Sequence, residues 1–336
     1  MSEKPKGRFN IKRLFNVKRL AIGVAGILIL GGTIWVILPM LGIGGKEPAP
    51  FDPNQVASDA MEPDLIPGIP PRAATDDADA APRTLPPRPA DQPVGIAFLQ
   101  AIIEPIESEL NRFWGWRPND IIQFTDNVNN YQLGVLEATR RTSIVLAERI
   151  SRSGGSDPYI HELAQARSLF AINPTTFMFP RPEAKYREGI ENIRKYKDMI
   201  RKGTARLHNR MDNLLPLLLT YESILGSCTE NLLRYDVSFF KVDDIFFYSQ
   251  GAAAMILCAM KGVGVDFRGS IEGAKGVEAY EEIVVSLEQV VGMRPFIVLK
   301  GGPHSVFANH RANMAGPMSR ARFNMNILHG ALTGNM

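Results

Sequence analysis

Motifs of known enzymes and cofactor-binding proteins are missing from this sequence of 336 residues. His161 and Glu162 begin an H-E pair, but Gln165 stands where the zinc-binding H-E-x-x-H pattern needs its second histidine. There is no G-x-S-x-G turn for a nucleophilic serine. The Gly-Val-Gly run at 262–264 lacks the third glycine of a dinucleotide-binding loop. We therefore predict no metal and no cofactor, and we favour a non-catalytic protein over an enzyme.

An excess of charge is also missing, because 38 basic residues are matched by 35 acidic ones and the net charge is +3. This average conceals three regions: residues 1–20 carry +6, residues 46–94 carry −5 and residues 95–336 carry +2. The last region has no long Lys/Arg stripe with interleaved aromatic side chains, so we predict no nucleic-acid binding.

Cysteine is scarce, since Cys228 and Cys258 are the only two. They are too few for the disulfide framework of a small secreted domain. A single disulfide between them could form in an oxidising compartment and would contribute about 3–4 kcal/mol of stability in the chain-entropy model. The alternative is that both are small buried hydrophobic groups, because each lies on an apolar helix face.

Long hydrophobic runs are limited to residues 20–45, which contain no charged residue. About 20 apolar residues suffice to cross a bilayer core of about 30 Å. Seven basic residues precede the run, so the positive-inside rule places residues 1–19 in the cytoplasm and the remainder of the chain beyond the membrane. A cleaved signal peptide is less favoured, because its apolar region is usually about 7–15 residues long. We therefore predict a single-pass signal-anchor.

The basic residues before the run form a six-residue repeat that contains Lys12, Arg13, Lys18 and Arg19. These four side chains could contact anionic lipid headgroups. The simpler interpretation is that they only set the orientation of the anchor.

Proline gathers in residues 46–94, which hold 12 of the 24 prolines and a single aromatic residue, Phe51. Such a composition cannot bury enough apolar surface to offset the entropy of folding. We therefore predict an acidic, disordered linker, whose 49 residues could extend on the order of 100 Å. A proline-rich ligand for a partner at residues 85–89 is the alternative.

Residues 95–336 show helical periodicity and no sustained strand alternation, so we predict an all-α domain. We expect about eight helices packed at shallow angles in a bundle. The apolar run 244–264 is short for a membrane span and is predicted to be the central core helix. Gly251 and the three alanines after it would let a neighbouring helix approach closely.

Three clusters of polar and aromatic residues are candidates for a site. Their key residues are Trp114, Trp116, Asp120, Asp244, Tyr248 and His310. Tryptophans beside amides and carboxylates could line a pocket with a polar rim, adjacent carboxylates could supply an acid or base, and a histidine could serve as a general base. Structural roles as a tryptophan lid, helix caps and a glycine turn are simpler explanations for all three.

Five short segments, at 116–120, 130–134, 183–189, 244–248 and 308–310, occur in the same order in an uncharacterised proteobacterial family. Over about residues 95–333 the chain resembles this family, domain-of-unknown-function family 2333. The resemblance implies a short N-terminal anchor in a Gram-negative inner membrane and a helical body in the periplasm. It implies no activity, cofactor or catalytic residue.

These observations predict four regions: a basic cytoplasmic segment at 1–19, an anchor at 20–45, a linker at 46–94 and a periplasmic helical domain at 95–336. Our first hypothesis is a non-catalytic envelope scaffold that is held in the bilayer and binds another envelope protein. The alternative is a periplasmic enzyme or small-ligand-binding domain. Its site would lie around Trp114, Trp116, Asp120, Asp244 and His310.

Overall fold

The computed structural model describes residues 85–113, 115–120, 126–152, 160–177, 181–234, 237, 241–295, 298 and 309–334. The chain divides into two units, Met1–Asp77 and Ala78–Met336, and every described residue belongs to the second. The predicted cytoplasmic segment, the predicted anchor and the predicted linker as far as residue 84 lie outside the described residues.

The described part of the chain is all-helical and contains no β-strand, which confirms the predicted fold class of the body. Its nine α-helices are α3 (Ile96–Leu110), α4 (Asp126–Val145), α5 (His161–Phe170), α6 (Pro182–Arg201), α7 (Met211–Leu233), α8 (Val242–Asp266), α9 (Arg268–Gly273), α10 (Val277–Gly292) and α11 (His310–Thr333). A π-helical turn, Leu146–Ile150, extends α4. The expectation of about eight helices differs from these nine by the short α9, whose six residues are too few to show a periodic pattern.

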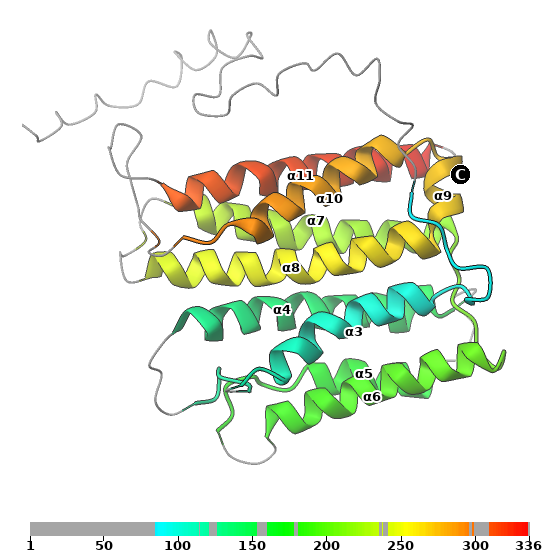
Figure 1. Cartoon of the computed structure of the whole chain (residues 1–336), viewed down its shortest axis with the longest axis horizontal. Coiled ribbons are helices and arrows are strands. Elements are labelled where there is room, and N and C mark those ends of the chain that lie inside the picture. The colour runs from blue at the N-terminus through cyan, green and yellow to red at the C-terminus, as the bar shows by residue number, and fades with distance from the viewer. Residues whose placement is uncertain are drawn as a thin grey trace, which may run out of the picture. The chain divides into compact units, whose positions relative to one another are not determined.

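The helices pack in successive layers (Figure 1). α10 and α11 lie against α7 and α8, α8 in turn contacts α3 and α4, and α5 and α6 cover the far side of α3 and α4. One end of the bundle therefore gathers the end of α3 and the beginnings of α4, α8 and α11.

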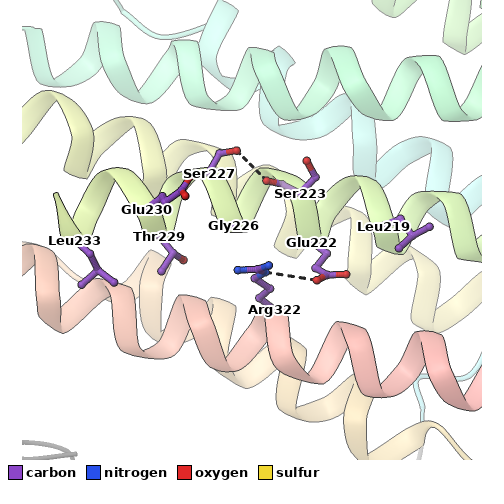
Figure 2. Close-up of a pocket in the computed structure, with 9 residues that line it drawn as sticks. All are labelled: Leu219, Glu222, Ser223, Gly226, Ser227, Thr229, Glu230, Leu233 and Arg322. Carbon is purple, nitrogen blue, oxygen red and sulfur yellow. Dashed lines mark hydrogen bonds and ion pairs between the residues drawn. The ribbon is translucent and has the colours of Figure 1, made fainter. Parts of the chain in front are cut away.

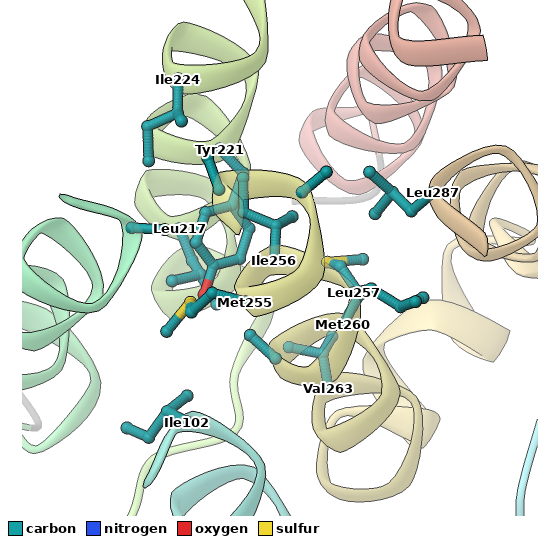
Figure 3. Packing of buried hydrophobic residues seen from close by; sticks show 14 of the residues in the cluster. Ile102, Leu217, Tyr221, Ile224, Met255, Ile256, Leu257, Met260, Val263 and Leu287 are labelled. Carbon is teal, nitrogen blue, oxygen red and sulfur yellow. The ribbon is translucent and has the colours of Figure 1, made fainter. Parts of the chain in front are cut away.

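α8 is the central helix of the body, as its apolar sequence predicted. Its side chains Met255, Ile256 and Met260 are completely buried and pack against α7, α4, α3 and α10 (Figure 3). By length and composition α8 is also the one helix within the described ranges that could cross a membrane, but 67% of its most apolar window is buried inside the body. That burial favours the core interpretation of α8.

Two glycines bring α4 and α8 into unusually close contact. A Cβ atom added to Gly251 would lie 2.0 Å from the carbonyl oxygen of Tyr131, and one added to Gly134 would lie 2.0 Å from that of Tyr248. Real Cβ atoms essentially never approach a heavy atom so closely. The close approach predicted for Gly251 is therefore confirmed, and Gly134 is its counterpart on α4.

Cys228 and Cys258 are both free thiols, so the disulfide that the sequence allowed is not present. Cys228 lies on α7 with its thiol beside Ser249 of α8. Cys258 follows Ser249 by nine residues, which places it about 13 Å along α8 and on its opposite face. Two cysteines in this arrangement cannot meet the short Cα separation of a disulfide. The structure instead shows Cys228 as a buried hydrophobic group, which was the alternative interpretation. Burial raises the pKa of its thiol to about 11.

Candidate functional site

The described residues of the three clusters lie at one end of the bundle, where α3 ends and α4, α8 and α11 begin. Trp114 and the Gly-Gly-Pro turn before His310 fall outside the described residues. The structure describes the remaining candidates, which are Trp116, Asp120, Asp244, Tyr248 and His310.

Trp116 is a buried anchor for the segment that joins α3 to α4. Its indole Nε1 donates a hydrogen bond of 3.0 Å to the carbonyl oxygen of Pro174, and its ring meets the edge of Tyr186 on α6 at 5.1 Å between centroids. The completely buried side chain of Gln132 on α4 fixes the same segment, because it accepts from the Arg117 N–H at 2.9 Å and donates to the Gly115 carbonyl at 3.0 Å. These contacts fit the predicted tryptophan lid better than a ligand-binding wall.

The carboxylates of the first two clusters are held by different neighbours. Asp120 pairs with Arg117 at 3.1 Å, within the segment between α3 and α4. Asp244 accepts a hydrogen bond of 2.6 Å from the side-chain amide of Asn130, so it joins α8 to α4. α8 begins at Val242, so Asp243 and Asp244 lie in its first turn and not at the predicted capping position. There their negative charge compensates the positive amino end of the helix dipole.

Tyr248 lies on α8 and His310 begins α11. Burial, with a smaller contribution from Glu137, raises the pKa of Tyr248 to about 12, so its hydroxyl stays protonated at neutral pH.

His310 is the first residue of α11, where the side chain of Asn309 caps the helix by accepting a hydrogen bond of 3.1 Å from the Ala312 N–H. Next to it, Arg311 donates to the Leu232 carbonyl at 2.8 Å and to the Arg234 carbonyl, which ties α11 to the end of α7. Trp116 and His310 are therefore held by different layers of the bundle.

A pocket of about 300 Å³ does open at this end, but none of the six key residues of the three clusters lines it. It is bordered by Arg112, Asn127, Val128, Tyr131, Phe247, Gln250, Val291, Met293 and Arg294. Arg112 lies over the Tyr131 ring at 5.7 Å and is paired with Glu109, while Gln250 donates 2.6 Å to the Met293 carbonyl. The sequence indicated only part of this border, because the first cluster continues from the tryptophans through Asn127, Val128 and Tyr131. The other polar residues of the pocket come from separate helices and share no motif with that cluster.

A larger groove, of about 500 Å³, lies along α7 and α11 (Figure 2). Leu219 and Leu233 mark its two ends on α7, and Ser223, Gly226 and Ser227 lie between them. From α11, Arg322 reaches over the groove to Glu222 at 3.5 Å. A Cβ atom added to Gly226 would lie 3.3 Å from the Arg322 guanidinium carbon, so this glycine makes room for the arginine.

The two leucines that line this groove are exposed, Leu219 to 49% and Leu233 to 51%. Phe323, which follows Arg322 on α11, is 66% exposed, and Ile327 is 45% exposed, but neither lines the groove. The exposure of Phe323 and Ile327 has a signal in the sequence. Phe323 and Ile327 fall outside the buried stripe of α11, which runs through Met318, Ala321, Met325 and Leu328.

Metal-binding chemistry has no support within the described ranges, where no group of three His, Cys, Asp or Glu residues lies close enough together to hold an ion.

A family model described as an uncharacterized protein conserved in bacteria, domain-of-unknown-function family 2333, matches residues 24–237 and 230–332. The match confirms the resemblance seen in the sequence, and its range begins within the predicted anchor. Neither the curated proteins nor the solved structures contain a match to this chain.

Proposed function

The chain belongs to domain-of-unknown-function family 2333, which has no assigned activity. On that premise we propose that it is a membrane-anchored, non-catalytic protein. Its helical body binds another envelope protein. The docking surface is the groove between α7 and α11. Its occupant is an amphipathic helix of the partner with an apolar stripe and a basic residue.

The observation that carries this proposal is the distribution of exposed apolar side chains. Eight large hydrophobic residues are exposed in the described part of the chain, and four of them lie on the two helices that form the groove. Leu219 and Leu233 of α7 line the groove itself, and Phe323 and Ile327 lie on the exposed surface of α11. Scattered single apolar residues on a surface need no explanation, whereas a group beside a groove is typical of an interaction site. Amphipathic helices bind such grooves through apolar side chains spaced by three or four residues.

The floor of the groove suits a helix in particular. Ser223 and Ser227 have short side chains and Gly226 has none, so these three positions leave space along one face of α7. The distance between packed helices is about 8–10 Å and depends on the side chains at the contact, so small residues permit the closer packing. Larger side chains at these positions would fill the space that a partner helix needs.

The charges of the groove indicate what the partner should carry. Glu222 is paired with Arg322, but Glu230 is exposed and forms no ion pair within the described ranges. A basic residue on the partner would therefore find an acidic side chain at the border of the groove. Such pairs contribute more to selecting a partner than to the affinity itself.

The proposal is tested by photo-crosslinking in intact cells, with benzoylphenylalanine placed at Phe323 of the full-length protein. The matched control is the same substitution at Phe177, which is 57% exposed in the segment between α5 and α6. We expect a discrete adduct with another envelope protein from position 323 and none from position 177. Adducts of equal yield from both positions, adducts only with a second copy of this chain, or no adduct from position 323 would each overturn the proposal.

The crosslinked partner segment then allows a direct measurement. Its synthetic peptide, titrated into the purified full-length protein, should bind at least ~10-fold more weakly to Ser227→Trp, because the indole fills the groove floor. Phe177→Trp should bind as the native protein does. Equal affinity for the native protein and Ser227→Trp would contradict docking in this groove.

A further inference from the structure

Lys197 is the feature of the body that its fold explains least. It lies on α6 at a position of the buried stripe that runs through Tyr186, Ile190, Ile193 and Ile200, and only 8% of its surface is exposed. Lysine is almost never buried in this way unless it is paired. The neighbour that its Nζ contacts is neutral: Nζ donates a hydrogen bond of 2.7 Å to Oε1 of Gln100 on α3.

The buried ammonium is not neutralised by a carboxylate. Within the described ranges Lys197 forms no ion pair, and burial lowers its pKa, with further lowering by Arg201 and Arg194 that Asp198 and Glu107 only partly oppose. Leaving a buried cation with only an amide partner costs stability. A side chain that is retained at such a cost is a candidate for binding a ligand.

Lys197 lines a pocket of about 340 Å³ between α3, α6 and α8. Arg201 of α6 and Lys261 of α8 also line this pocket, so three cationic side chains from two helices converge on it. Arg201 is paired with Asp198 at 3.0 Å and Lys261 with Glu288 at 2.8 Å. Asp198 and Glu288 are not among the residues that line the pocket, where Glu104 is the one acidic side chain.

We infer that this pocket is an anion-binding site and that it holds a phosphate group, with Lys197 as the central contact and Arg201 and Lys261 at the rim. Lysine is a common phosphate ligand because its compact charge can approach an oxygen from several directions. Glu104 of α3 also lines the pocket, and it accepts a hydrogen bond from a hydroxyl of the ligand or of the phosphate itself. The volume suits a small phosphorylated molecule or a lipid headgroup, since ligand pockets begin at about 300 Å³.

The site does not depend on the groove between α7 and α11, because it is formed by other helices. Its failure would leave the proposed docking function standing, and the reverse also holds.

The test uses the full-length protein in nanodiscs, and its readout is the midpoint of thermal unfolding followed by circular dichroism. In discs of phosphatidylcholine alone, inorganic phosphate at a saturating concentration should raise the midpoint by on the order of 3 °C. Potassium chloride at equal ionic strength controls for screening. In a second arm, discs containing phosphatidic acid without free phosphate should raise the midpoint only if the ligand is a lipid headgroup.

The variant that decides is Lys197→Met, which keeps most of the side-chain volume and removes the buried charge. It should fold, and it should lose the midpoint shift in whichever arm shows one. The matched control is Lys195→Met, which removes an exposed lysine two residues away on the same helix and should keep the shift. No shift in either arm, or a shift that persists in Lys197→Met, would overturn the anion site.

Discussion

At the scale of single residues, Asp266 shows how a distant side chain completes a helix. α3 begins after Gly95, which makes no side-chain cap, and Oδ2 of Asp266 at the end of α8 accepts from the Phe98 N–H at 2.7 Å, across 168 positions of sequence. Asp266 is 1% exposed, and this burial raises the pKa of its carboxyl despite backbone hydrogen bonds that favour the charged form. The hydrogen bonds that make Asp266 a cap therefore oppose, but do not cancel, the free-energy cost of burying its carboxylate.

This balance makes a prediction for stability as a function of pH. A carboxyl whose pKa is higher in the folded than in the unfolded protein binds more protons when folded. Its contribution to stability is largest below its ordinary pKa of about 4 and is lost as the pH rises through the raised folded value. Asp266→Asn keeps an oxygen acceptor for the Phe98 N–H but cannot ionise. We expect the free energy of unfolding of this variant, measured with urea from pH 4 upward, to lack that fall.

Asp266→Ala separates the cap from the charge. It removes the acceptor altogether and should lower the free energy of unfolding by about 1–2 kcal/mol, as the loss of other helix caps does. If the native protein and Asp266→Asn changed in parallel with pH, burial of this charge would have no measurable effect.

Residue roles were the part of this protein that the sequence predicted least well. Trp116 has the same neighbours in sequence whether it covers a pocket or anchors a loop. Only its hydrogen bond to the Pro174 carbonyl and its ring contact with Tyr186 decide between these two roles. Lys197, in contrast, lies in the buried stripe of α6, among apolar residues spaced by three or four positions. A charged residue in such a stripe is a signal that could have been recognised without a structure.

At the scale of helices, the contact between α4 and α8 depends on two glycines more than on any motif. Gly134→Ala would place a methyl group 2.0 Å from the Tyr248 carbonyl oxygen, which belongs to the rigid backbone of α8. The two helices would have to separate along a contact that includes the central helix of the body. We expect a loss of at least ~3 kcal/mol in the free energy of unfolding, at the upper end of overpacking effects.

Gly330→Ala is the matched control for that loss. Gly330 also lies inside a helix, α11, but a Cβ atom there would meet nothing within 4 Å. Alanine is the better helix former, so this variant should gain about 0.4–1 kcal/mol. Urea unfolding of both variants checks the pair, and a Gly134→Ala protein as stable as the native one would show that the contact is looser than described.

The helices themselves were predictable because the 3-4 spacing of apolar residues reports the face that each one buries. The stripe through Leu214, Leu218, Tyr221 and Leu225 is completely buried in α7, as the spacing requires. The same spacing cannot show a π-helical turn such as Leu146–Ile150, which extends α4 without any interruption in the apolar pattern. Nor can it show which helices are neighbours, since packing partners are chosen by shape across the whole core.

At the scale of the whole molecule, the uneven distribution of charge remains the basis for the predicted topology. The residues before the apolar run carry a net charge of +6, the following proline-rich region is acidic, and the helical body is nearly neutral. A body that binds a partner protein would gain reach from a long linker, because the groove between α7 and α11 could then meet a partner some distance from the bilayer. This arrangement requires the anchor and the body to lie where the positive-inside rule places them.

Reporter fusions test that requirement directly. Alkaline phosphatase joined after Met336 should be active, because it folds only where disulfides form, and a green fluorescent protein at the same position should stay dark when exported unfolded. Replacing the seven basic residues of the first 19 with serine removes the charge asymmetry that sets the orientation. We expect this replacement to reduce phosphatase activity and raise fluorescence. A fluorescent fusion of the native sequence, expressed at full length with inactive phosphatase, would place the body in the cytoplasm and leave the groove to a cytoplasmic partner.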